Sequence, residues 1–121
     1  MDEQELRKRT KTFALDVMRF TEELPRMRTT DVIGKQLLRC GTSVGANYRS
    51  ACRARSKPDF IAKMGIVLEE SDEALYWMEL LHESRAVPAE SIKPLAKEAN
   101  ELVSIIAASI KTARRAAKAS I

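Results

Sequence analysis

The segment Glu79-Leu80-Leu81-His82 is the arrangement in this sequence that comes nearest to a catalytic metal site. A carboxylate and an imidazole three positions apart share one face of a helix, and di-iron helix bundles use such pairs as ligands. Those sites need two pairs and two further glutamates that point into the core. His82 is the only histidine, and helical spacing places Glu79 on a polar face. We therefore expect no metal, no cofactor and no catalysis.

The two cysteines, Cys40 and Cys52, offer little further chemistry. They lie twelve residues apart in one predicted helix, which separates them by about 18 Å, far beyond the roughly 7 Å that a disulfide spans. A structural zinc site needs four ligands, which two cysteines and one distant histidine cannot supply. Both are expected to be reduced thiols in or near the core.

Basic side chains dominate residues 35–63, which hold seven Lys and Arg residues against one acid, Asp59. Four of them, Lys35, Arg39, Arg49 and Arg53, share an arc of roughly 80° on a helical wheel. Such cations contact phosphates without reading sequence. The candidate nucleic-acid-binding residues are Arg39, Arg49, Arg53, Arg55 and Lys57. A second basic group that could assist them is Lys111, Arg114, Arg115 and Lys118.

Acidic side chains dominate residues 66–101, with nine acids against three basic residues, so the net charge of +4 hides a strong asymmetry. Five of the acids share an arc of roughly 120° on the predicted third helix. They are Glu69, Asp72, Glu73, Glu79 and Glu83. Tyr76 and Leu80 lie among them and Trp77 at their border, which is typical of an interface. The arginine stripe of one subunit could meet this acidic stripe on the next and close a ring. Alternatively, both stripes are solvated or pair within one subunit, and Trp77 is a half-buried residue at the rim of the core.

Apolar residues at helical spacing predict four amphipathic helices, at about residues 4–24, 31–54, 57–85 and from about 88 onward. Pro25 ends the first, Ser56 with Pro58 begins the third, and Pro88 with Ser91 begins the fourth. The links are too short to cross a bundle, so neighbouring helices must run antiparallel. We predict an all-α, up-down-up-down four-helix bundle with one domain, 1–121, and a basic tail at about 112–121.

All four glycines lie within helical patterns, where Gly costs about 1 kcal/mol relative to Ala. Gly34, Gly41, Gly45 and Cys52 form a smooth stripe that lets another helix approach closely, either from the same chain or from a second subunit. Asn47 lies between this stripe and the polar face. Its amide could join helices or touch a ligand, or could make a structural hydrogen bond.

The composition suits one compact domain, with 121 residues that are 45% hydrophobic and 31% charged. The first four residues are acidic and polar, and no apolar run approaches the roughly 18 residues of a membrane span. We therefore expect a cytoplasmic protein with neither signal peptide nor membrane partner.

Three runs carry a resemblance to a known family: residues 36–39 (Gln-Leu-Leu-Arg), 42–49 (Thr-Ser-Val-Gly-Ala-Asn-Tyr-Arg) and 53–60 (Arg-Ala-Arg-Ser-Lys-Pro-Asp-Phe). They resemble the four-helix-bundle proteins encoded in intervening sequences of bacterial 23S rRNA genes. The resemblance implies a homopentamer with a basic surface and no known catalytic activity. It also implies similarity to the accessory protein of diversity-generating retroelements, which binds nucleic acid. Many members have Asn-Ile-Ala-Glu-Gly at positions 47–51 and Gly-Ser at 69–70, so this chain carries more charge on those faces.

Together these observations predict a non-enzymatic, oligomeric bundle that binds RNA or DNA through a basic surface without sequence readout. The alternative is a scaffold that binds a protein partner and has no role with nucleic acid. The residues predicted for the oligomer interface are Gly45, Asn47, Tyr76, Trp77, Leu80, Glu69 and Glu73.

Overall fold

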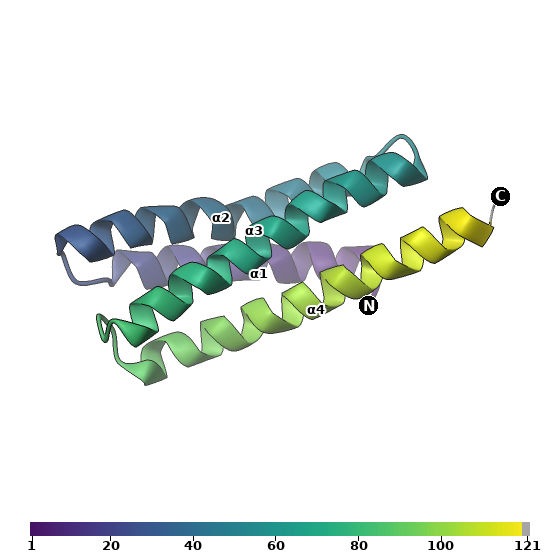
Figure 1. Cartoon of the computed structure of the whole chain (residues 1–121). Helices are drawn as coiled ribbons and strands as arrows, with labels where there is room; N and C mark the ends of the chain where they lie inside the picture. The colour runs from purple at the N-terminus through teal and green to yellow at the C-terminus, as the bar shows by residue number, and fades with distance from the viewer. Residues whose placement is uncertain (120–121) are drawn as a thin grey trace.

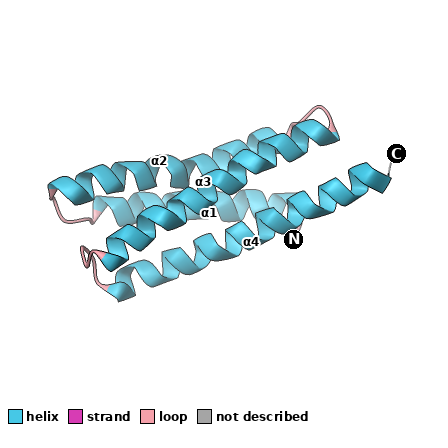
Figure 2. Cartoon of the chain, viewed as in Figure 1, coloured by secondary structure: helices cyan, strands magenta, loops and turns pink. Residues whose placement is uncertain are grey.

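The computed structural model describes residues 1–119, which form four α-helices and no strand (Figure 1, Figure 2). The helices are α1 (Glu3–Glu22), α2 (Arg28–Cys52), α3 (Lys57–Glu83) and α4 (Ala89–Ala119). The all-α prediction is confirmed, and the predicted helix ends fall within a few residues of those observed. None of the helices in the described range is long and apolar enough to cross a bilayer.

Side chains that satisfy free backbone N–H groups determine where the helices begin. The Asp2 carboxylate accepts a hydrogen bond from the backbone N–H of Glu5 at 2.8 Å and caps α1. Ser56 accepts from the N–H of Asp59 at 3.1 Å and caps α3, as the sequence predicts. The threonines Thr29 and Thr30 are the sequence's candidates for capping α2, but Met27 is the N-cap. Thr30 instead reaches back to accept a hydrogen bond from the Met27 N–H at 3.1 Å.

Helix α4 includes most of the basic tail predicted at about 112–121. The helix continues without interruption through Ala119, and residues 120 and 121 lie outside the described part of the chain. Alanine and long basic side chains have high helix propensity, which supports these last turns. The basic residues of this segment therefore have fixed positions along a helix.

Consecutive helices pack side by side and antiparallel, and α4 returns to pack against α1, while the helices on the diagonals are not packing neighbours (Figure 1). Every helix contributes fully buried side chains to one core. The largest of these include Phe13, Leu37, Met64, Leu102 and Ile106. The seam between α1 and α4 is the least extensive, and Arg9 bridges it with two 2.7 Å hydrogen bonds to the Glu98 carboxylate. Hydrogen bonding to Glu98 raises the pKa of Arg9 above its ordinary value.

Three of the four glycines let α1 and α2 approach closely within one chain. A Cβ atom at Gly41 would lie 2.9 Å from both methyl groups of Val17, and one at Gly45 would lie 3.3 Å from the Thr10 hydroxyl. Gly34 similarly faces Leu24. Close packing within the chain, one of the two alternatives for the glycine stripe, therefore accounts for Gly45, and its role at a subunit interface stays a prediction.

Gly41→Ala is expected to lower the free energy of unfolding by about 1–2 kcal/mol, because the added methyl group clashes with the branched, inflexible side chain of Val17. Gly65→Ala is the matched control. A Cβ atom there meets no heavy atom within 4 Å, so the substitution should stabilise the protein by about 0.5–1 kcal/mol through helix propensity. Denaturant unfolding at one protein concentration measures both. Equal shifts in the same direction would contradict the packing described for Gly41.

Candidate nucleic-acid interface

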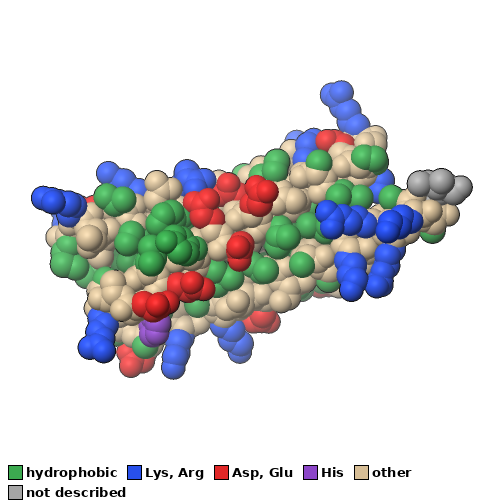
Figure 3. Space-filling view, in the orientation of Figure 1, with side chains coloured by type: hydrophobic (Ala, Val, Ile, Leu, Met, Phe, Trp, Pro, Cys, Tyr) green, Lys and Arg blue, Asp and Glu red, His purple; other side chains and the backbone are tan. Residues whose placement is uncertain are grey.

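The antiparallel order gathers basic residues from distant parts of the sequence at one end of the bundle. The C-terminal end of α2, the link to α3 and the last turns of α4 all lie at this end (Figure 1). Figure 3 shows Lys and Arg side chains over the last turns of α4, whereas acidic side chains gather toward the middle of the same view. We define the basic end as Arg49, Arg53, Arg55, Lys57, Lys111, Arg114, Arg115 and Lys118.

The side chains of the basic end are exposed, and none of them makes an ion pair with a described residue. The nearest acid in sequence, Asp59, has other partners. Its carboxylate accepts from the backbone N–H of Arg55 at 3.2 Å and pairs with Lys63 at 3.2 Å. Both contacts lower the pKa of Asp59, the backbone hydrogen bond most. The guanidinium groups of Arg53 and Arg55 therefore remain available to an external anion.

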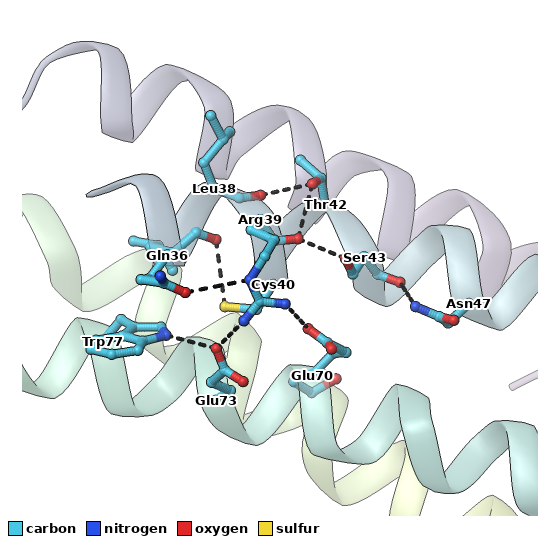
Figure 4. A network of polar contacts seen from close by, with 12 residues as sticks. Gln36, Leu38, Arg39, Cys40, Thr42, Ser43, Asn47, Glu70, Glu73 and Trp77 are labelled. Atoms are coloured by element: carbon cyan, nitrogen blue, oxygen red, sulfur yellow. Dashed lines mark hydrogen bonds and ion pairs between the residues drawn. The ribbon is translucent and has the colours of Figure 1, made fainter. Parts of the chain in front are cut away.

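Arg39, which the sequence also predicts as a nucleic-acid contact, is not part of the basic end and has anionic partners within the molecule. Its guanidinium group pairs with Glu70 at 3.3 Å and with Glu73, so that it joins α2 to α3 within one molecule (Figure 4). Desolvation opposes the charge of Arg39, but the hydrogen bond that it donates to Glu73 and the charges of both carboxylates raise its pKa above the ordinary value. The sequence allowed the basic and acidic stripes to pair within one subunit, and Arg39 does pair in this way.

Glu73 and Trp77 also have partners inside the molecule. The indole N–H of Trp77 donates to the Glu73 carboxylate at 3.0 Å, and the indole ring packs against the core (Figure 4). Trp77 is thus a half-buried rim residue, and Glu73 connects it to Arg39. These internal contacts account for the positions of Glu73 and Trp77, and their roles at a subunit interface stay predictions.

Asn47 makes a structural hydrogen bond. Its side-chain amide donates to the backbone carbonyl of Ser43 at 2.9 Å, one turn earlier in α2, and so does not join two helices through this bond.

Cys40 is buried and Cys52 half-buried, and both are free, as expected from their spacing. Burial raises the pKa of the Cys40 thiol to about 12, so it stays protonated at neutral pH.

The other predicted interface residues do lie together on the outer face of α3. Tyr76 is 52% exposed, Leu80 is half-buried and Glu69 is exposed. The ring of Tyr76 packs edge-on against Trp77, with centroids 5.1 Å apart, which holds it in place on the surface. Glu79 and His82 are both exposed, and the described residues include no cluster of three His, Cys, Asp or Glu suited to a metal ion.

Sequence reasoning missed a second exposed apolar face, on α1. Leu15 is 41% and Met18 46% exposed, and they continue the line of Lys8 and Lys11 at helical spacing. The signal was present, because these residues fall outside the inward pattern of Leu6, Phe13 and Val17 in the same helix. We call this line, Lys8, Lys11, Leu15 and Met18, the α1 face.

The fold and these surfaces define an all-α antiparallel bundle protein with a cationic end. The chain belongs to the 23S rRNA-intervening sequence protein family, whose model matches residues 2–108. It is similar to the crystal structure of a protein of unknown function from the S23 ribosomal protein family of Bacteroides thetaiotaomicron. That likeness has a TM-score of 0.84 and 32% identity, over 92% of this chain and 99% of the other. No protein with curated annotation matches. The family resemblance predicted from the sequence is confirmed.

Proposed function

We propose that this protein is a non-enzymatic, cytoplasmic bundle that binds RNA or DNA by phosphate contacts at its basic end, without sequence readout. The observation that carries the proposal is a set of exposed cations from α2, α3 and α4 that have no anionic partner among the described residues. Because these cations make no ion pairs within the described molecule, none has to be broken when a phosphate backbone binds. Counterion release from the nucleic acid then drives association.

Helix dipoles alone give a weaker account of the same charges. A cation stabilises the negative end of a helix only within its last turn. Arg49 meets that condition in α2, but Lys111 lies about two turns before Ala119, where α4 ends. Lys57 lies at the start of α3, where a cation is unfavourable to the dipole. An external anion explains all three positions.

The expected result of Arg49→Glu with Arg53→Glu is a large loss of affinity for mixed-sequence RNA and DNA fragments, because two phosphate contacts become repulsive. In a salt titration, the slope of log K against log salt should fall by about 0.9 for each lost contact. The control is Arg26→Glu with Arg28→Glu, which makes the same charge change with exposed residues at the opposite end of the bundle. The control should bind as the native protein does.

Absence of binding by the native protein at low salt would contradict this function and favour the scaffold alternative. A partner held by apolar anchors such as Tyr76 would also bind with little dependence on salt. Equal losses in the two double variants would mean that only net charge matters, and not the basic end.

The exposed faces of α1 and α3 support a second proposal, self-assembly into a ring. The α3 face presents Tyr76 and Leu80 among exposed Asp72, Glu79 and Glu83, while the α1 face presents Leu15 and Met18 beside two lysines. The two faces are therefore complementary, because both expose apolar side chains and their charges are opposite in sign. Because Arg39 is paired internally, we assign the basic side of the contact to α1, in place of the α2 stripe expected from the sequence.

The placement of the two faces favours a head-to-tail contact. Helices α1 and α3 lie on a diagonal of the bundle and are not packing neighbours, so their outer faces point in different directions. A contact between α1 of one copy and α3 of the next can repeat and close into a ring. Five subunits is the number that the family resemblance implies, and we propose a homopentamer.

Two complementary variants test this contact by light scattering with size-exclusion chromatography. Leu15→Glu with Met18→Glu removes the α1 face, and Tyr76→Glu removes the α3 face; each variant alone should be monomeric. Mixed together they should form dimers, since one intact contact remains between them. Val32→Glu, at an exposed apolar residue of α2, is the control and should leave the pentamer intact. A monomeric native protein, or an unmixed variant that still forms the ring, would refute the assignment.

A further inference from the structure

An open groove runs between α3 and α4 near the basic end. It encloses about 590 Å³. On the α3 side it is lined by Gly65, Leu68 and Glu69. On the α4 side it is lined by Ala107, Ile110, Lys111, Arg114, Arg115 and Lys118. The groove therefore has small and apolar residues along its floor and four cations along one wall.

Gly65 is the one glycine that packing within the chain does not explain. Gly41 and Gly45 face α1 and Gly34 faces Leu24 in the link after it, but a Cβ atom at Gly65 would meet no heavy atom within 4 Å. A glycine in a helix interior is less favourable than alanine by about 1 kcal/mol, so the position has a cost without a packing benefit. What the missing side chain does provide is space in the groove.

The cations of the α4 wall recur at one-turn spacing along the helix, at positions 111, 114 or 115, and 118. None of them makes an ion pair with a described residue, and Glu69 is the only acid that lines the groove. A row of unpaired cations beside an apolar floor is complementary to a ligand with regularly spaced anions and flat apolar groups. A single nucleic-acid strand has that chemistry.

We propose that this groove binds a single strand of RNA or DNA, with its phosphates along the α4 cations and its bases against Leu68 and Ala107. This rests on the proposed function and makes it more specific. Packed helices have axes about 8–10 Å apart, so a groove between neighbours admits one strand. A duplex, whose major groove alone is about 12 Å wide, can only lie across it. The groove would therefore favour single strands over duplexes.

Gly65→Leu tests the groove directly because it fills the space and changes no charge. We expect about a tenfold loss of affinity for a fluorescent 12-nucleotide single strand, and unchanged affinity for the matching duplex. Ala62→Leu is the control: it adds the same kind of bulk to α3 at an exposed position outside the groove, and it should bind as the native protein does. Circular dichroism and denaturant unfolding establish that both variants are folded.

Arg114→Gln with Arg115→Gln should weaken single-strand binding further and reduce its salt slope, since phosphate contacts are removed. If Gly65→Leu binds single strands as the native protein does, the proposal for the groove is wrong. That result does not affect the proposal that Arg49 and Arg53 contact phosphates. If Gly65→Leu lowers the assembled mass in light scattering and leaves affinity unchanged, the groove holds a second copy of the chain, and the proposal is also overturned. If the native protein binds neither the single strand nor the duplex, the proposed function itself is wrong.

Discussion

The antiparallel order of the four helices decides where the charges of this molecule lie. Residues 49–57 and 111–118 are more than fifty positions apart, yet alternating helix direction places both at one end. The order is maintained by the close contact of α1 with α2, where glycines admit Val17 and Thr10, and by a core to which all four helices contribute. If that contact were lost, the two basic segments would no longer form one surface.

Ion pairs inside the molecule separate structural charges from available ones. Arg39 is held by Glu70 and Glu73, and Arg9 by Glu98 and Glu101, so each joins two helices. Ion pairs at a protein surface contribute little, about 0–1 kcal/mol each, so these two connect neighbouring helices without dominating stability. Eight cations without an ion pair to a described residue lie together at the basic end, and the others are spread over the rest of the molecule. Because helices α2, α3 and α4 bring these eight to one end without pairing them, an external anion is their natural partner.

Local signals in the sequence were sufficient for the helices. Capping by Ser56 and the inward spacing of apolar residues are properties of neighbouring positions, and both predictions were confirmed. A helical wheel gives the direction of Arg39 from its own axis but not what stands opposite, so its pairing with Glu70 and Glu73 could not be deduced. For the same reason the glycine stripe allowed two partners, and only the packing identified α1. Gly65 resembled the other glycines until the groove between α3 and α4 was visible.

Hydrogen–deuterium exchange of the native protein, with and without a short single-stranded oligonucleotide, tests the basic end most directly. We expect slower exchange in peptides that cover residues 49–57 and 107–118, and no change in those that cover the α1–α2 link around Arg26, at the opposite end. Protection confined to that opposite end, or no protection at an oligonucleotide concentration that saturates binding, would contradict the account.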